Sequence, residues 1–317
     1  MARANITSES LSLTNMQIFK VDLLDAITIS KNIVGVLMPL FFIYVNCVMV
    51  FALRRKPIFH ETSRYILFGH MLLNDSVLLL VTTIMYAISL SVIQITTAIC
   101  TLLQFVSNCT LRNAPLTLAV MSLERYVAIC FPLRHCNIAT PKITYIALGI
   151  IWLLSSLDFI IDFIYAFFIN SYHLAEIMHC SRDRLFPAKW QMDKSQGFDA
   201  FYFVSVAVII IFTYISIMVT AKSVSSDKGS ARKAHRTVLL HLIQLGLCLT
   251  SILYVIIEKS LNLIVGNLRI LNYIIVLVLP RCLSPLIYGL RDDAVRPLFK
   301  YYFSCRSGKF RPSVNVH

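Results

Sequence analysis

Seven long apolar segments constrain this chain most strongly, because each is long enough to cross a lipid bilayer. A bilayer core requires about 20 mostly apolar residues in helical form, since only a helix satisfies its own backbone hydrogen bonds in lipid. The predicted spans are 32–53, 65–90, 98–123, 143–168, 200–221, 238–257 and 270–290. Three of them contain no charged residue, and the other four contain one or two. The sequence therefore predicts an all-α bundle of seven transmembrane helices.

The composition excludes a water-soluble globule, because 57% of the residues are hydrophobic and only 14% are charged. The net charge of +13 does not indicate nucleic-acid binding, since the basic residues lie in short connections rather than on one soluble face. One set of connections, together with the C-terminal tail, contains 18 Lys and Arg residues, and the other side contains 9. The positive-inside rule predicts an extracellular N-terminus and a cytoplasmic C-terminus. A multi-pass protein of the plasma membrane is expected, in contact with membrane lipid.

The predicted organisation has three parts. They are an extracellular N-terminus at 1–31, a transmembrane domain at 32–290 and a cytoplasmic helix and tail at 291–317. The first 30 residues lack a continuous apolar stretch, so a cleaved signal peptide is not expected. Asn5 opens the sequence Asn-Ile-Thr and is a predicted glycosylation site. After the seventh span, apolar residues recur at helical spacing with Arg296 and Lys300 between them, which predicts a short amphipathic helix at the interface.

Three motifs occur in order along the predicted helices. They are Met121–Cys130 followed by Pro132–His135, Lys233–His235 with His241-Leu242, and Pro285–Gly289. Together they resemble the signatures of rhodopsin-like (class A) G-protein-coupled receptors in their odorant-receptor form. The segments Arg112–Leu116 and Pro280–Pro285 are most similar to fish-type odorant receptors. The resemblance implies a receptor for an odorant that activates a heterotrimeric G protein, of the stimulatory type.

The resemblance also implies roles for residues at the cytoplasmic face. Glu124 would hold Arg125 in the resting state, beside Tyr126, and Arg125 would later meet the G protein. Tyr214 and Tyr288 match tyrosines that help to hold the active arrangement. An arginine that exchanges one partner for another gives two discrete states. The alternative is that Arg125 and the tyrosines only anchor the helices at the interface.

A disulfide between Cys100 and Cys180 is likewise implied by the resemblance, and an extracellular position makes it chemically reasonable. The second outer loop contains no other cysteine, which leaves its fold less constrained.

The charged residues inside the predicted spans require partners, because a lone ion at the helix centre costs about 2.5–3.5 kcal/mol. At about 1.5 Å per residue, depth in the membrane suggests that Arg112 pairs with Asp158 or Asp162. The same reasoning pairs Asp75 with Arg281. Arg281 would then replace the sodium ion that related receptors hold at the matching acid. For Arg112 the alternative is the binding of an anionic odorant.

The resemblance implies a ligand cavity that opens outward between the third, fifth, sixth and seventh helices. Helical spacing selects candidate contacts, each of which is also explained by packing. These are Gln104, Asn108, Leu111, Arg112, Tyr202, Ser205, Ile252, Ile256 and Tyr273. A mostly apolar lining with a few polar groups suits small, sparingly charged molecules.

A small-solute transporter or ligand-gated channel is the main alternative function. The chain contains only 9 Gly and neither repeated halves nor paired broken helices, which argues against it. An enzyme is not expected, because no catalytic motif occurs at a useful spacing. No cofactor and no metal site are predicted, since the histidines near Cys180 fit no strong ligand spacing.

Overall fold

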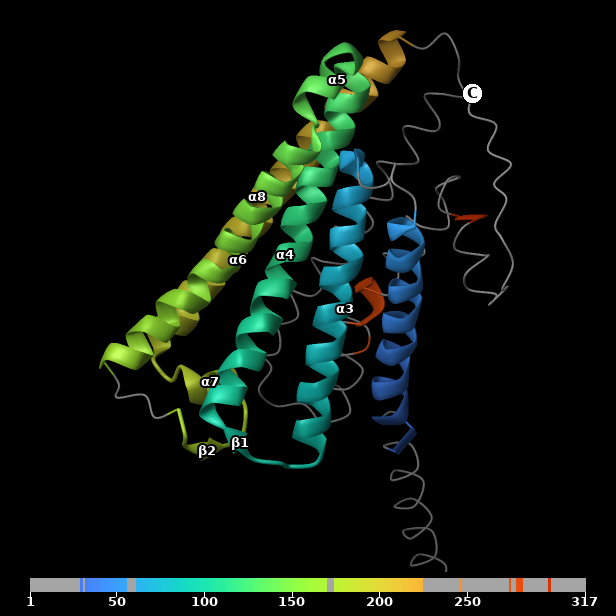
Figure 1. Ribbon diagram of the computed structural model, residues 1–317. Helices are drawn as coiled ribbons and strands as arrows, with labels where there is room; N and C mark the ends of the chain where they lie inside the picture. The colour runs from blue at the N-terminus through green and yellow to red at the C-terminus, as the bar shows by residue number, and fades with distance from the viewer. Residues whose placement is uncertain are drawn as a thin grey trace, which may run out of the picture.

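The computed structural model describes residues 29–30, 32–55, 61–169, 174–224, 246, 274, 278–281 and 296–297. Long helices dominate the described chain (Figure 1). They are the helix Asn32–Arg54, α3 (Ser63–Leu90), α4 (Thr97–Cys130), α6 (Pro141–Ile169) and α8 (Lys189–Val224). The short elements are α5 (Pro132–Ile138), α7 (Arg182–Leu185), β1 (Ile95–Thr96) and β2 (Ile177–Met178).

Helix α4 lies at the centre of the described bundle, where it contacts α3, α6 and α8 (Figure 1). The short helix α5 lies at one end of the bundle, and β1, β2 and α7 lie at the opposite end. Four helices among the described residues are long and apolar enough to cross a membrane, namely Asn32–Arg54, α3, α6 and α8. The more polar composition of α4 fits its central place, because protein rather than lipid surrounds much of it.

The observed helices extend the predicted spans at several ends. Helix α4 continues from the predicted end at 123 to Cys130, so it includes Glu124 and Arg125. Helix α8 begins at Lys189 rather than at 200, and this predicted boundary was wrong. The charged residues before the predicted apolar span belong to this helix, and two of them, Lys194 and Asp199, have ion-pair partners on α6 and α4. Apart from Gly246, Ile274 and residues 278–281, the predicted sixth and seventh spans lie outside the described residues, as do most of the terminal segments.

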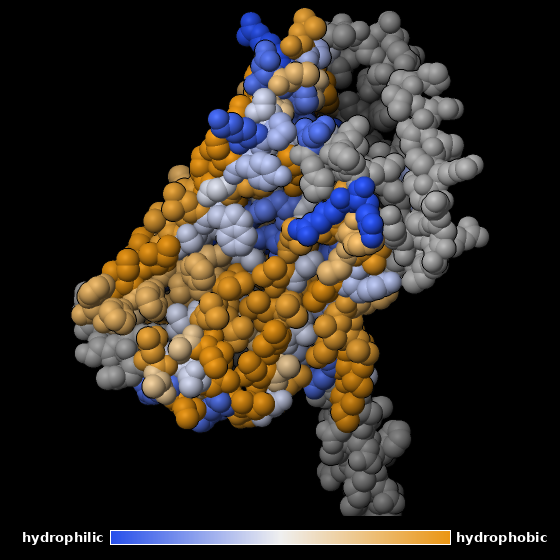
Figure 2. Space-filling view, viewed as in Figure 1, coloured by the Kyte–Doolittle hydropathy of each residue, from blue (hydrophilic) through white to orange (hydrophobic). Residues whose placement is uncertain are grey.

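Apolar side chains pack the described helices against one another. One cluster joins the first long helix to its neighbours through Met49, Leu67, Met71, Met121 and Ile151. A second joins α4 to α8, with Leu118 and Ala119 against Val206 and Ile210. Hydrophobic side chains also cover much of the described surface in Figure 2, as expected for helices that face lipid.

The outer loop is attached to the start of α4 by a small sheet and a disulfide. Ile95 of β1 pairs with Met178 of β2 in an antiparallel arrangement. The expected disulfide joins Cys100 of α4 to Cys180, with 5.4 Å between the Cα atoms. Beneath it, Phe159 of α6 packs with Leu185 and Phe186, both of which are buried. This arrangement brings the loop residues after Cys180 to the mouth of the bundle between α4 and α6.

Candidate functional site

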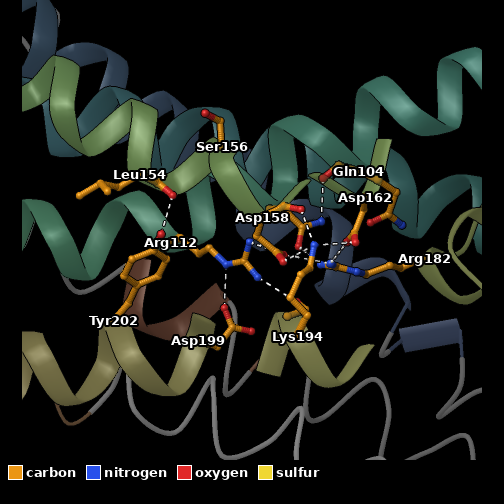
Figure 3. Close-up of polar contacts among 12 residues, drawn as sticks. Gln104, Arg112, Leu154, Ser156, Asp158, Asp162, Arg182, Lys194, Asp199 and Tyr202 are labelled. Carbon is orange, nitrogen blue, oxygen red and sulfur yellow. Dashed lines mark hydrogen bonds and ion pairs between the residues drawn. The ribbon is translucent and has the colours of Figure 1, made fainter. Parts of the chain in front are cut away.

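Arg112 is the centre of a buried polar site in the half of the bundle that carries the disulfide (Figure 3). Its side chain comes from α4 and is 6% exposed. Nη1 lies 2.7 Å from Asp158 Oδ2 of α6, and Nε donates to Asp199 Oδ1 of α8 at 2.7 Å. Nη2 donates to Ser195 Oγ at 2.9 Å. All three guanidinium nitrogens are therefore engaged, which favours the ion-pair interpretation over the binding of an anionic odorant.

Asp158 and Asp162 are fully buried on α6 and share two further cations. Lys194 Nζ of α8 lies 2.9 Å from Asp158 Oδ1 and 2.6 Å from Asp162 Oδ1. Arg182 Nη2, from the outer-loop helix α7, donates to Asp158 Oδ2 at 3.1 Å and to Asp162 Oδ2 at 3.0 Å. Arg112 thus pairs with Asp158, as one of the predicted alternatives had it, while the described contacts of Asp162 are with other cations.

These six side chains form one network, here called the outer charge network, of Arg112, Asp158, Asp162, Arg182, Lys194 and Asp199. Its three cations and three carboxylates have formal charges that cancel. Sequence reasoning missed Arg182, Lys194 and Asp199, because they were assigned to a loop. A signal was present, since one arginine with two buried aspartates leaves an unbalanced negative charge, which is costly to bury. A neutral buried site therefore requires at least one more cation from a neighbouring segment.

A second ion pair joins α3 to the predicted seventh span. Arg281 Nη1 donates to Asp75 Oδ1 at 3.3 Å, and both side chains are buried. Val278, one turn before Arg281, packs against Leu79 of α3. The structure therefore brings Asp75 and Arg281 together, as their depths suggested.

The motif around Glu124 and Arg125 lies at the end of the bundle opposite the disulfide. Arg125 Nε lies 3.5 Å from Glu124 Oε2, and the other oxygen of Glu124 lies 3.2 Å from His135 Nε2 of α5. The Tyr126 ring contacts the rings of Phe131 and, on α8, Phe212. Glu124 thus contacts both Arg125 and α5 through one carboxylate. Sequence reasoning quoted His135 as the end of the motif Pro132–His135 but gave it no role of its own.

The structure brings only some of the predicted ligand contacts close to one another. Asn108 Oδ1 accepts from Arg182 Nη1 at 2.6 Å, and its amide nitrogen donates to the Gln104 carbonyl at 2.8 Å. Tyr202 donates to the Leu154 carbonyl of α6 at 2.7 Å, and the half-buried Ser205 donates to the Phe201 carbonyl on its own helix. Leu111 is half-buried on α4. Ile252, Ile256, Tyr273, Tyr288 and Asn5 lie outside the described residues, whereas Tyr214 lies on α8.

The sequence is similar to that of a known protein family and to those of several known proteins. The sequence model described as 7 transmembrane receptor (rhodopsin family) matches residues 45–288. The chain is 39% identical to odorant receptor 131-2 of Danio rerio, over 98% of this chain and 97% of that protein. The chain belongs to the rhodopsin family of seven-transmembrane receptors, in its odorant-receptor branch. Human olfactory receptor 2M3 is 30% identical over 57% of this chain and 60% of its own length. Zebrafish galanin receptor 2a is 26% identical over 65% of this chain and 59% of its own length.

Family membership confirms the seven-span fold class and the odorant-receptor assignment that the motifs predicted. The receptor is a multi-pass membrane protein, and the transporter or channel alternative has no support from these relatives. Arg112 of the outer charge network and Arg125 of the motif lie on the same helix, α4, about 20 Å apart along its axis at 1.5 Å per residue. Helix α4 therefore connects the two sites directly.

Proposed function

We propose that this odorant receptor binds a small extracellular molecule within the bundle and activates a heterotrimeric G protein of the stimulatory type. The proposal includes no catalytic step. The candidate contacts named from helical spacing line the ligand cavity, with the network's Arg112 as a structural ion pair beside it. Ligand binding that favours one arrangement of the helices shifts the population toward the state with an open cytoplasmic face.

The observation that carries the proposal is the contact of Glu124 with both Arg125 and His135. Glu124 holds Arg125 at 3.5 Å from the same helix and His135 at 3.2 Å from α5. A carboxylate with two partners on different segments can keep one and release the other when the helices move. Release exposes Arg125 to a G protein in the resting-to-active transition, with Tyr126, Tyr214 and Tyr288 supporting the active arrangement.

The proposed orientation has the disulfide end outside and α5 in the cytoplasm. A disulfide between Cys100 and Cys180 requires an oxidising compartment, which supports an extracellular position for that end. The excess of Lys and Arg in the connections at the other end supports a cytoplasmic position. The proposal keeps 1–31 outside as a glycosylated N-terminus, 32–290 in the membrane and 291–317 in the cytoplasm.

The experiment is a ligand screen on surface-expressed receptor with cyclic AMP as the readout. Amino acids, bile-type steroids, amines and small hydrophobic odorants cover the main chemical classes. Once a responding compound is found, Arg125→Ala is expected to abolish the cyclic-AMP response while binding of that compound persists. Lys142→Ala, which removes an exposed cation at the start of α6, is the matched control and should respond normally. A normal response in Arg125→Ala would overturn the proposal.

A further inference from the structure

Arg182 differs from the other members of the outer charge network because it comes from a loop rather than from a spanning helix. It is the first residue of α7, two residues beyond the disulfide cysteine Cys180. Its side chain is 21% exposed, yet it reaches two carboxylates that are fully buried. A loop residue that satisfies buried groups of the bundle links the position of the loop to the stability of the network.

We propose that Arg182 is a positioning residue that fastens the outer loop onto the bundle through Asn108, Asp158 and Asp162. Its guanidinium uses two nitrogens for three acceptors on two helices. Nη1 donates to Asn108 Oδ1 at 2.6 Å, and Nη2 donates to Asp158 at 3.1 Å and Asp162 at 3.0 Å. The planar fork of arginine makes such contacts directional, so they fix an orientation as well as a distance.

The rest of the loop has a different attachment. Residues 174–180 are held at the start of α4 by the β1 and β2 pairing, by the disulfide and by the amide of Thr97, which donates to the Glu176 carbonyl at 2.8 Å. Asn108 lies eight residues after Cys100 on the same helix, which is about 12 Å further along its axis. Arg182 therefore gives the loop a second attachment point, further along the axis of α4. Two separated attachment points prevent the loop from rotating about its attachment at the start of α4.

Apolar packing offers a competing explanation for the position of α7. Leu185 and Phe186 are 2% and 1% exposed and pack near Phe159. Apolar contacts are not directional, however, and they do not compensate buried carboxylates. Without Arg182 the network contains two cations for three carboxylates, and the buried pair on α6 loses the cation that the loop supplies. The ionic attachment thus supplies what the apolar contacts do not, namely a direction and compensation of the buried carboxylates, and its removal is costly because it leaves buried charge uncompensated.

Hydrogen exchange of α7 in the full-length receptor, in lipid nanodiscs, tests the proposal without any odorant or G protein. The reporters are the amides of Leu185 and Phe186, which donate to the carbonyls of Ser181 and Arg182. In Arg182→Ala these amides should exchange about tenfold faster or more, the change expected when hydrogen bonds to charged groups are lost. Arg184→Ala is the matched control, since Arg184 is an exposed arginine of the same helix. It should leave the exchange rate unchanged.

Two results would overturn the proposal. One is equal exchange in wild type and Arg182→Ala, which would assign the attachment to the apolar residues alone. The other is the same acceleration in Arg184→Ala, which would reflect a general effect on α7. If Arg182→Ala does not reach the membrane, the charge-balanced variant Arg182→Ala/Asp162→Asn replaces it, and accelerated exchange is again expected. Because the measurement does not depend on signalling, its failure leaves the proposed function standing.

Discussion

Arg112 has no free guanidinium nitrogen, and this determines what its removal does. Asp199 contacts it through Nε, and Asp158 loses its nearest cation when it is absent. Removing one partner from buried ion pairs costs about 3–5 kcal/mol when charge is left uncompensated, and without Arg112 the network holds two cations, Lys194 and Arg182, for three carboxylates. Arg112→Ala should therefore lower the free energy of unfolding of the detergent-solubilised receptor by about 3 kcal/mol.

Denaturation of purified receptor measures this loss. Arg184→Ala, which removes an arginine exposed on α7, is the control and should keep the midpoint of the wild type. An unchanged midpoint in Arg112→Ala, with normal surface expression, would show that the ion pairs of Arg112 do not stabilise the fold.

The Asp75 and Arg281 pair predicts insensitivity to sodium. Arg281 already supplies a cation to the buried carboxylate at 3.3 Å, so a sodium ion there would meet a fixed positive charge. Replacing sodium by an inert organic cation should leave the potency of an activating odorant unchanged in the cyclic-AMP assay. In Arg281→Ala, if it reaches the surface, potency should become sodium-dependent. A clear sodium effect on the wild type would contradict a permanent pair.

At the scale of elements, α5 presents an apolar side chain where the proposed cytoplasmic face meets water. Leu133 is 96% exposed and lies two residues before His135, which contacts Glu124. Burial of a leucine contributes about 1.5–3 kcal/mol, equivalent to about tenfold or more in affinity. Leu133→Asp should therefore weaken G-protein activation about tenfold or more while odorant binding stays normal.

The matched control is Asn137→Asp, which adds the same charge at another exposed position of α5. Nucleotide exchange by a purified G protein with receptor in nanodiscs gives the comparison. Equal activation by the Leu133 and Asn137 variants would remove α5 from the contact surface.

Much of the helical architecture was predictable because each span needs only a long apolar run, which is a local property of the sequence. The pairing of Arg112 with Asp158 was also within reach, since the helical rise gives each charge a depth. The start of α8 was not predictable from the sequence. Charged residues such as Lys194 and Asp199 are typical of loops, and their partners on neighbouring helices are known only from the structure. The contacts of Arg182 were harder to predict, because helical periodicity does not indicate where the side chain of a loop residue lies between two helices. The contact between His135 and Glu124 depends in the same way on how α5 folds back.

At the scale of the whole molecule, the two polar sites on α4 face opposite sides of the membrane in the proposed orientation. The outer charge network (Figure 3) lies toward the disulfide end, and Glu124 and Arg125, near the end of α4 at Cys130, lie toward α5. Apolar side chains cover much of the described surface, which suits a bilayer (Figure 2). An extracellular ligand and a cytoplasmic G protein are thus linked by one continuous helix only if the chain crosses the membrane as proposed.

Epitope mapping in intact and permeabilised cells tests that arrangement most directly. With one tag before residue 1 and another after residue 317, antibody should bind the N-terminal tag on intact cells and the C-terminal tag only after permeabilisation. Detection of both tags on the same side of the membrane would contradict a seven-span receptor that carries an external signal to an inner arginine.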